Sequence, residues 1–423
     1  MFKKLSKIKN IIGSNKDGKV LIQNFAYLSL LQVAGYIFPL ITMPYLAKVI
    51  GVEGFGKIAF AAAVMIWLQT IADWGFNFTA TRDVAQNRED SRKVSEIFSR
   101  VLWARIVLML ISAVILFLLV VFIPLFKKNA DVLFVSFLMI PGHILFPDWF
   151  FQAMERMKYI TILNVASKLL FTIAVFVFIK EKSDYILQPL LTSLGFLFSG
   201  IIAFYYILIK WKIKLYKPSL NSIWDTIRKS TDVFLNNLLP NLYNSFSTVL
   251  LGIFGGEVAN GIFDAGKKFI TIAQQFMTML SRAFFPFLSR KIEKHHVYTR
   301  INIILSLTFS TFLFLFAPII IKTFFTDEFS DSVIVLRIMS FSIFFMSLND
   351  IYGTNYMIIK GNEQELRNIT LIVSVLGFAL SFPLIYYWGY IGATITVTLT
   401  RGISGICIML RAKTLKNKAI YCN

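Results

Sequence analysis

The sequence contains few charged residues. They account for 16% of the 423 positions, whereas soluble proteins have roughly 25%. Hydrophobic residues reach 57%, aromatic residues 16%, and the mean hydropathy is +0.68. A soluble core has no room for so much apolar surface, so the composition predicts a membrane protein whose solvent is lipid.

The residues on which catalysis and cofactor binding usually depend are also scarce. Two cysteines, Cys407 and Cys422, are too few for a disulfide framework. There is no glycine-rich phosphate loop of the Walker type, and His143, His295 and His296 are not at metal-ligand spacing. No pair of acids is placed for glycosyl or phosphoryl transfer. We therefore expect no metal, no cofactor and no enzymatic reaction, which leaves secondary transport.

Long apolar runs dominate the chain. Twelve of them have about 20 residues each, the length of a helix that crosses a bilayer. They predict an all-α polytopic membrane protein. The expected spans are 22–46, 55–77, 101–123, 132–153, 160–179, 185–209, 232–254, 258–280, 301–321, 332–352, 368–387 and 389–410.

The basic residues alternate along these spans. Of the 43 lysines and arginines, 30 lie at the two termini and in the even-numbered loops, and seven lie in the odd-numbered loops. Because cations are retained on the cytoplasmic side, both termini are predicted to be cytoplasmic. The net charge of +20 thus reflects topology and does not indicate nucleic acid as a partner. The short external loops also argue against a membrane enzyme with a large external catalytic loop.

The arrangement of the spans indicates an internal duplication. Six spans over 1–209 form a predicted N-terminal lobe, a polar basic stretch at 210–231 a cytoplasmic linker, and six spans over 232–423 a C-terminal lobe. Parallel repeats of this kind occur in transporters. Chance similarity between apolar segments remains the alternative. The matching anchors are Gly51-Val52-Glu53 with Gly255-Gly256-Glu257, and Asp148 with Asp350.

Several charged residues fall within the spans. Arg105 and Arg337 are near predicted span ends, where their side chains are expected to reach the interface. The deep cations are Lys168, Lys267, Lys268 and Arg401. Asp264 lies four residues before Lys268, so an internal ion pair competes with a binding role. The excess of deep cations predicts a water-filled, positively charged cavity for an anionic substrate. The candidate coupling acids are Asp73 and Asp264.

Neutral polar side chains form stripes at helical spacing. They are candidates for the polar lining of the cavity, although hydrogen bonds between helices are an equally good explanation. The candidates are Gln32, Tyr36, Asn237, Asn241, Asn244, Gln274 and Gln275. Pro240 lies within the stripe of the seventh span and is expected to kink that helix.

Four segments resemble the O-antigen and capsular repeat-unit flippases, which are the polysaccharide transporter family of the multidrug/oligosaccharidyl-lipid/polysaccharide superfamily. The strongest signature, at the end of the fourth span, reads PDWFFQAMERMKY. The segments are 45–56 (YLAKVIGVEGFG), 73–82 (DWGFNFTATR), 147–159 and 284–289 (FFPFLS). Together with the length and span number, the resemblance covers nearly the whole chain.

The resemblance implies twelve helices in two six-helix lobes around a central cavity that opens alternately to each side of the bacterial inner membrane. It implies that the substrate is an oligosaccharide on polyprenyl pyrophosphate, for O-antigen lipopolysaccharide or capsule. Membrane lipid and the polymerase and export proteins of the same pathway would be partners. A multidrug or cation antiporter of the same superfamily is the alternative, weakened because the first span has no acid. A membrane polymerase or glycosyltransferase acting on the same lipid-linked sugar is another.

Overall fold

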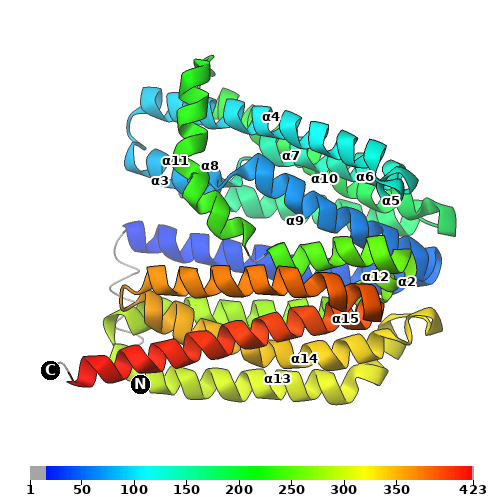
Figure 1. Cartoon of the computed structure of the whole chain (residues 1–423). Coiled ribbons are helices and arrows are strands. Elements are labelled where there is room, and N and C mark those ends of the chain that lie inside the picture. The colour runs from blue at the N-terminus through cyan, green and yellow to red at the C-terminus, as the bar shows by residue number, and fades with distance from the viewer. Residues whose placement is uncertain (1–15, 240, 422–423) are drawn as a thin grey trace. The chain divides into compact units, whose positions relative to one another are not determined.

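The computed structural model describes residues 16–239 and 241–421, which are helical and contain no β-strand (Figure 1). In these ranges, nine helical segments are long and apolar enough to cross a membrane. Three helices, α2, α12 and α15, are each interrupted by one glycine, at Gly51, Gly256 and Gly389. Counting each of these three as two spans gives the twelve that the apolar runs predict. The all-helical polytopic class is confirmed.

The chain divides into two compact units. The first comprises 1–45, 68–180 and 186–235, and the second comprises 46–67, 181–185 and 236–423. Residues 46–67 and 181–185 thus belong with the second unit, although they precede the predicted linker. The lobe boundaries predicted at 209 and 232 remain a prediction.

Several helices of the first unit begin or end at residues whose capping or helix-breaking role is recognisable in the sequence. Asp90 caps α4, because its carboxylate accepts the backbone N–H groups of Arg92 and Lys93 at 3.1 and 3.0 Å. Pro147 precedes α8, where the predicted fourth span is divided into three helices. The elements are α2 (Lys16–Asp73), whose residues 46–67 belong to the second unit, α3 (Phe76–Gln86), α4 (Ser91–Phe122), α5 (Pro124–Lys128), α6 (Ala130–Phe137), α7 (Met139–Leu145), α8 (Asp148–Ala153), α9 (Met157–Phe178), α10 (Leu187–Tyr205), the π-helical turn η2 (Tyr206–Lys210) and α11 (Leu220–Leu238).

Aromatic side chains form the core beneath α8. Trp149 and Phe150 are fully buried, and both rings pack against Phe98 of α4. The opposite surface of α4 exposes Leu110 and Phe117, each more than half accessible. A helix that is apolar on its outer side as well as its inner side is suited to lipid.

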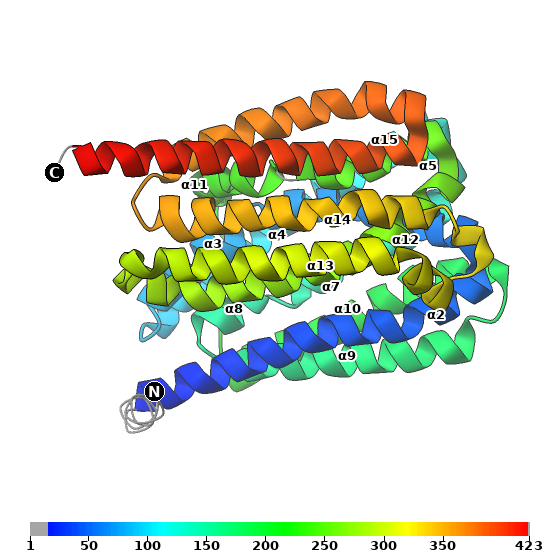
Figure 2. The same ribbon diagram turned by 90° about the horizontal axis from the view of Figure 1, so that it is seen from below.

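The second unit packs its long helices side by side. α13, α14 and α15 are neighbours in both views (Figure 1, Figure 2), and α12 packs against α14 and α15. The elements are η1 (Lys182–Ile186), α12 (Asn241–Arg290), η3 (Ile292–Lys294), α13 (His295–Phe324), η4 (Asp327–Phe329), α14 (Ser332–Leu348), the π-helix η5 (Asn349–Ile358) and α15 (Glu363–Tyr421).

Two of the glycine interruptions share one backbone conformation. Gly51 has φ 68° and ψ −178°, and Gly256 has φ 77° and ψ −173°. Only glycine occupies this region without strain of about 1–3 kcal/mol. The structural counterpart of Gly51 is therefore Gly256, one residue beyond the Gly255 with which the sequence alignment pairs it.

The predicted seventh span, 232–254, is divided between two helices. α11 ends at Leu238 and α12 begins at Asn241. Pro240 lies outside the described residues, but a proline lacks the N–H that a continuous helix needs and restricts the residue before it. α11 takes up the first part of the predicted span, and the kink expected at Pro240 stays a prediction.

Candidate functional site

The guanidinium group of Arg401, on α15, is held by neutral partners. Its Nη2 donates to Oδ1 of Asn244 at 2.9 Å, and its Nη1 donates to Oγ of Ser342 at 3.2 Å. The residue is only 9% exposed. Among the described residues, no carboxylate forms an ion pair with it. The positive charge of this buried group is therefore solvated by dipoles but not neutralised.

Lys267 reaches the same asparagine from α12. Its Nζ donates to the backbone carbonyl of Asn244 at 3.3 Å and lies 5.4 Å from the centre of the Phe263 ring. Two of the predicted deep cations, Lys267 and Arg401, thus converge on one predicted polar residue. Gln274 joins the group, because its Nε2 donates to Oγ of Ser342 at 3.3 Å. We call Asn244, Lys267, Gln274, Ser342 and Arg401 the Asn244 cluster.

Lys268 lies beside this cluster in sequence but has its own acid. Its Nζ is 2.9 Å from Oδ2 of Asp264, and the two side chains are 44% and 20% exposed. The ion pair that the i, i+4 spacing predicts is therefore present. Lys268 contributes less free positive charge than Lys267 or Arg401.

The remaining predicted lining residues are distributed over both units. In the second unit, Asn241 and Gln275 are half-buried on α12. In the first unit, Gln32, Tyr36 and Lys168 are half-buried. The ammonium group of Lys168 lies close to Gly35, since a Cβ atom added to that glycine would be 3.2 Å from Nζ. Side chains this polar and partly accessible fit a hydrated lining better than a lipid-facing surface. The side chain of Asn237 lies outside the described part of the structure.

Arg105 differs from its prediction. It is 3% exposed and forms an ion pair with Asp73 of α2, instead of reaching the interface. The reason is that α4 begins at Ser91, ten residues before the predicted span, so Arg105 lies well inside the helix. His143 and Asp148 lie within electrostatic range of this pair. Asp73, a candidate coupling acid, is thus engaged by a buried cation.

Two members of the Arg401 environment are absent from the sequence prediction. Ser342 of α14 accepts hydrogen bonds from both Arg401 and Gln274, and Tyr243 of α12 contacts the guanidinium. Ser342 lies in a series of buried serines with Ser340 and Ser347. Such a series could have indicated a polar site on this helix, but small hydroxyl residues are also common where helices pack closely.

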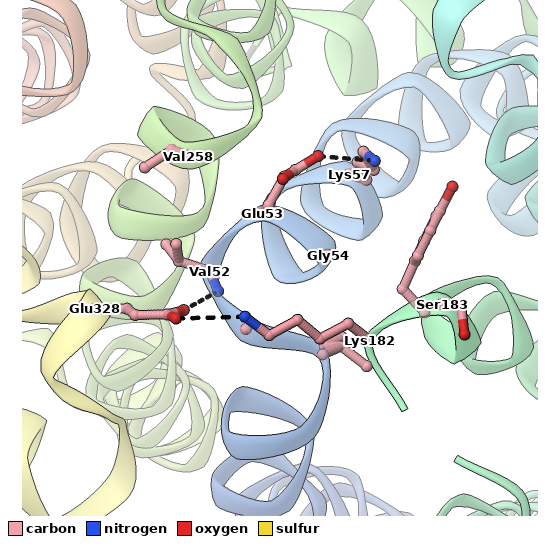
Figure 3. Close-up of a pocket in the computed structure, with 11 residues that line it drawn as sticks. Val52, Glu53, Gly54, Lys57, Lys182, Ser183, Val258 and Glu328 are labelled. Carbon is pink, nitrogen blue, oxygen red and sulfur yellow. Dashed lines mark hydrogen bonds and ion pairs between the residues drawn. The ribbon is translucent and has the colours of Figure 1, made fainter. Parts of the chain in front are cut away.

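A second polar site, in the second unit, surrounds the interruption at Gly51. It is a cavity of about 370 Å³ that contains two ion pairs (Figure 3). Glu328 of η4 accepts the backbone N–H of Val52 at 3.0 Å and pairs with Lys182 at 3.7 Å. Lys57 pairs with Glu53 at 3.0 Å. These residues come from the connections between spans 1 and 2, 5 and 6, and 9 and 10, all predicted to be external.

Comparison with known proteins gives a consistent result. Residues 21–292 match the protein family described as "Polysaccharide biosynthesis protein". A protein of Escherichia coli (strain K12) named "Putative O-antigen transporter" is 29% identical over 416 residues, which cover 96% of this chain and 100% of that protein. A protein of the same name from Shigella dysenteriae is 26% identical, with coverage of 92% and 99%.

Solved structures share the fold at low sequence identity. The lipid II flippase MurJ, in an inward closed conformation, superposes with a TM-score of 0.73 at 13% identity, over 93% of this chain and 87% of that one. A MATE P26A mutant gives a TM-score of 0.59 at 14% identity, over 96% and 97%. The likeness establishes the fold.

Proposed function

Since this chain belongs to the polysaccharide biosynthesis protein family, we propose that it is a flippase for polyprenyl-pyrophosphate-linked oligosaccharide repeat units. It would move them from the inner to the outer leaflet of the bacterial inner membrane, for O-antigen or capsule synthesis. The names of its relatives and the fold it shares with MurJ support transport of this class of molecule. Polymerase and export proteins of the same pathway would receive the product.

The Asn244 cluster is the observation that carries the proposal. A pyrophosphate is a strongly hydrated anion, so it enters a membrane protein only where charge and hydrogen-bond donors replace water. Arg401 and Lys267 supply two cations whose hydrogen-bond and ring partners are neutral, while the nearby carboxylate of Asp264 is paired with Lys268. The neutral partners position both side chains and leave their charge for the substrate. Asn241 and Gln275 would then bind sugar hydroxyls.

The ion pairs around Gly51 support transport by alternating access. Glu328, Val52 and Lys182 come from three different connections between spans, and the structure groups all three residues in the second unit. We propose that these bonds close the external side of the transporter and break when it opens outward. Because the pairs are partly exposed, they are weak enough to be exchanged for water.

A cation exporter is the alternative from the same superfamily, and MATE structures share the fold. The charge at the Asn244 cluster argues against it, because a site with two cations repels a cationic substrate. An exporter of organic cations would require a carboxylate at this position. The carboxylate within electrostatic range of Lys267 is Asp264, and Lys268 pairs with it at 2.9 Å.

The test is leaflet exchange in proteoliposomes that contain the purified protein and the lipid-linked oligosaccharide. We expect Arg401→Gln and Lys267→Gln to insert normally and to slow exchange at least about tenfold, since a charged hydrogen bond contributes about 1.5–3 kcal/mol. Arg401→Lys should retain part of the activity. Lys322→Gln, a predicted external lysine outside the cluster, is the matched control.

Two results would overturn the proposal. The first is wild-type exchange in both Arg401→Gln and Lys267→Gln, which would exclude the cationic site. The second is cleavage or extension of the sugar by the purified protein, which would indicate an enzyme. Exchange of intact lipid-linked oligosaccharide, lost in the two variants, supports the flippase.

A further inference from the structure

A small polar pocket in the first unit lies where α3, α4 and α11 meet. Its volume is about 110 Å³, well below the roughly 300–1,000 Å³ of pockets for drug-sized ligands. The pocket therefore suits a phosphate-sized group and not a sugar chain. The lining includes the carboxylate of Asp83 and the apolar side chains of Ala80, Ile97 and Val101. Each of the three helices also contributes one cation, and three hydroxyl groups lie beside them. These residues are Arg82, Arg100 and Lys229 with Thr79, Thr226 and Ser230.

The charges of this pocket are not balanced. Arg82 donates through Nε and Nη2 to Oδ1 of Asp83 at 3.0 and 2.9 Å, so its charge is neutralised. Arg100 is half-buried and Lys229 is exposed, and within 16–239 and 241–421 neither has an acidic partner within ion-pair distance. Two unneutralised cations that face one pocket favour an anion.

The wall of the pocket is held in place by contacts between α3 and α11. The hydroxyls of Thr79 and Ser230 lie 2.8 Å apart and share a hydrogen bond. The rings of Trp74 and Phe234 stack with centroids 3.9 Å apart and an interplanar angle of 2°. These contacts fix Lys229 relative to α3 before any ligand binds, which lowers the entropic cost of binding.

The outer surface of α11 indicates where the ligand comes from. Leu220 is 81% exposed and Trp224 67% exposed, whereas Ile223 and Ile227 on the other side of the helix are buried. Exposed leucine and tryptophan on an amphipathic helix are typical of a helix that lies in a membrane interface. Four lysines precede α11, at 210, 212, 214 and 217. The positive-inside distribution predicts that this surface faces the cytoplasmic leaflet.

We propose that this pocket binds the phosphate of an anionic phospholipid headgroup in the cytoplasmic leaflet. Arg100 and Lys229 pair with the phosphate, the hydroxyl of Thr79 donates to one of its oxygens while Ser230 donates to Thr79, and Trp224 inserts into the same leaflet from the outer side of α11. The site is separate from the Asn244 cluster and does not depend on what the protein transports. Because it joins α11 to α3 and α4, a bound lipid stabilises the first unit.

The experiment is native mass spectrometry of the purified full-length protein titrated with phosphatidylglycerol, phosphatidylcholine or inorganic phosphate. We expect phosphatidylglycerol to bind more tightly than phosphatidylcholine, in a salt-dependent manner, and inorganic phosphate to bind weakly. Arg100→Gln and Lys229→Gln should each weaken phosphatidylglycerol binding about fivefold. Lys217→Gln, which removes an exposed lysine outside the pocket, is the matched control.

Three results would overturn the proposal. They are equal binding of the two phospholipids, unchanged phosphatidylglycerol affinity in Arg100→Gln and Lys229→Gln, and inorganic phosphate binding as tight as phosphatidylglycerol, which would indicate a site for soluble anions. Since Lys229 is exposed, Lys229→Gln is expected to fold even if Arg100→Gln does not. That single variant keeps the proposal testable.

Discussion

Arg105 of the first unit and Arg401 of the second unit are both buried, but the chemical groups that contact their guanidinium groups differ. Arg105 forms an ion pair with the carboxylate of Asp73, and Arg401 is bonded to the amide of Asn244 and the hydroxyl of Ser342. The exposed fractions are 3% and 9%. Burial alone therefore does not distinguish a structural arginine from a binding one.

The chemistry of the partner makes the distinction. A carboxylate cancels the charge of a guanidinium, so an anion gains little by approaching the pair. Amide and hydroxyl oxygens satisfy the N–H groups but leave a full positive charge. We conclude that the partner, more than the depth, identifies the binding cation in this protein.

The largest expected effect is loss of the carboxylate beside Arg105. Asp73→Asn leaves a buried cation unpaired and should destabilise the protein by about 3–5 kcal/mol. The thermal midpoint in detergent should fall, and the yield of folded protein with it. Asp73→Asn with an unchanged thermal midpoint would show that Arg105 does not need its partner.

The converse change should make Arg401 resemble Arg105. Asn244→Asp places a carboxylate where Oδ1 now accepts from Nη2, so the charge of Arg401 is neutralised. We expect the thermal midpoint to be maintained while leaflet exchange falls about tenfold or more. Asn244→Ala is the control, since it removes the hydrogen bond without adding charge. If exchange survives in Asn244→Asp, the free charge of Arg401 is not required.

A smaller effect is expected at Asp264, whose partner Lys268 is 44% exposed. Water replaces the lost carboxylate, so Asp264→Asn should change the free energy of unfolding by less than about 1 kcal/mol. Leaflet exchange is maintained if Asp264 only pairs with Lys268, and it falls if Asp264 is the coupling acid that the sequence predicts. A loss of stability as large as that of Asp73→Asn would contradict the distinction between the two pairs.

The smallest effect is expected at Arg88 and Glu155, a pair on connections between helices. The Nη2 of Arg88 is 2.9 Å from Oε1 of Glu155, with side chains 39% and 52% exposed. The hydrogen bond from Arg88 lowers the pKa of the Glu155 carboxyl below its ordinary value of 4.5. A lowered carboxyl pKa stabilises the folded state above that ordinary value, and the contribution is lost as pH falls through the folded value.

Arg88→Gln should therefore reduce the thermal midpoint slightly at pH 7, by the equivalent of less than about 1 kcal/mol. It should have no effect well below pH 4. Melting curves of wild type and Arg88→Gln at a series of pH values provide the measurement. A loss of thermal midpoint that grows as the pH falls would contradict a stabilising role of the ionised Glu155 carboxylate.

The sequence predicts the helical class and the span number because a lipid environment allows few alternatives. Every backbone N–H and C=O group must be bonded within its own helix, so long apolar runs translate directly into spans. It also predicts Lys267, Arg401 and Asn244 as polar residues inside the membrane. Hydropathy does not reveal that all three meet, since they belong to α12 and α15, which are far apart in the sequence.

The errors have specific physical causes. Arg105 lies near the start of an apolar run, but α4 continues ten residues further toward the N-terminus because Asp90 caps it there. Its pairing with Asp73 depends on how α2 packs on α4, and hydropathy contains no such information. The seventh span is divided between α11, which ends at Leu238, and α12, which begins at Asn241, and an apolar run does not itself indicate where a helix ends within it.

The glycine interruptions have a practical consequence for the side of the protein that the basic residues predict to be external. At Gly51, Gly256 and Gly389, two consecutive spans meet at a single residue that leaves the helical conformation. Such a junction offers no segment for a protease to cut or an antibody to recognise, and no place to insert an epitope tag. The side predicted to be external therefore has no long connecting loop at these three points.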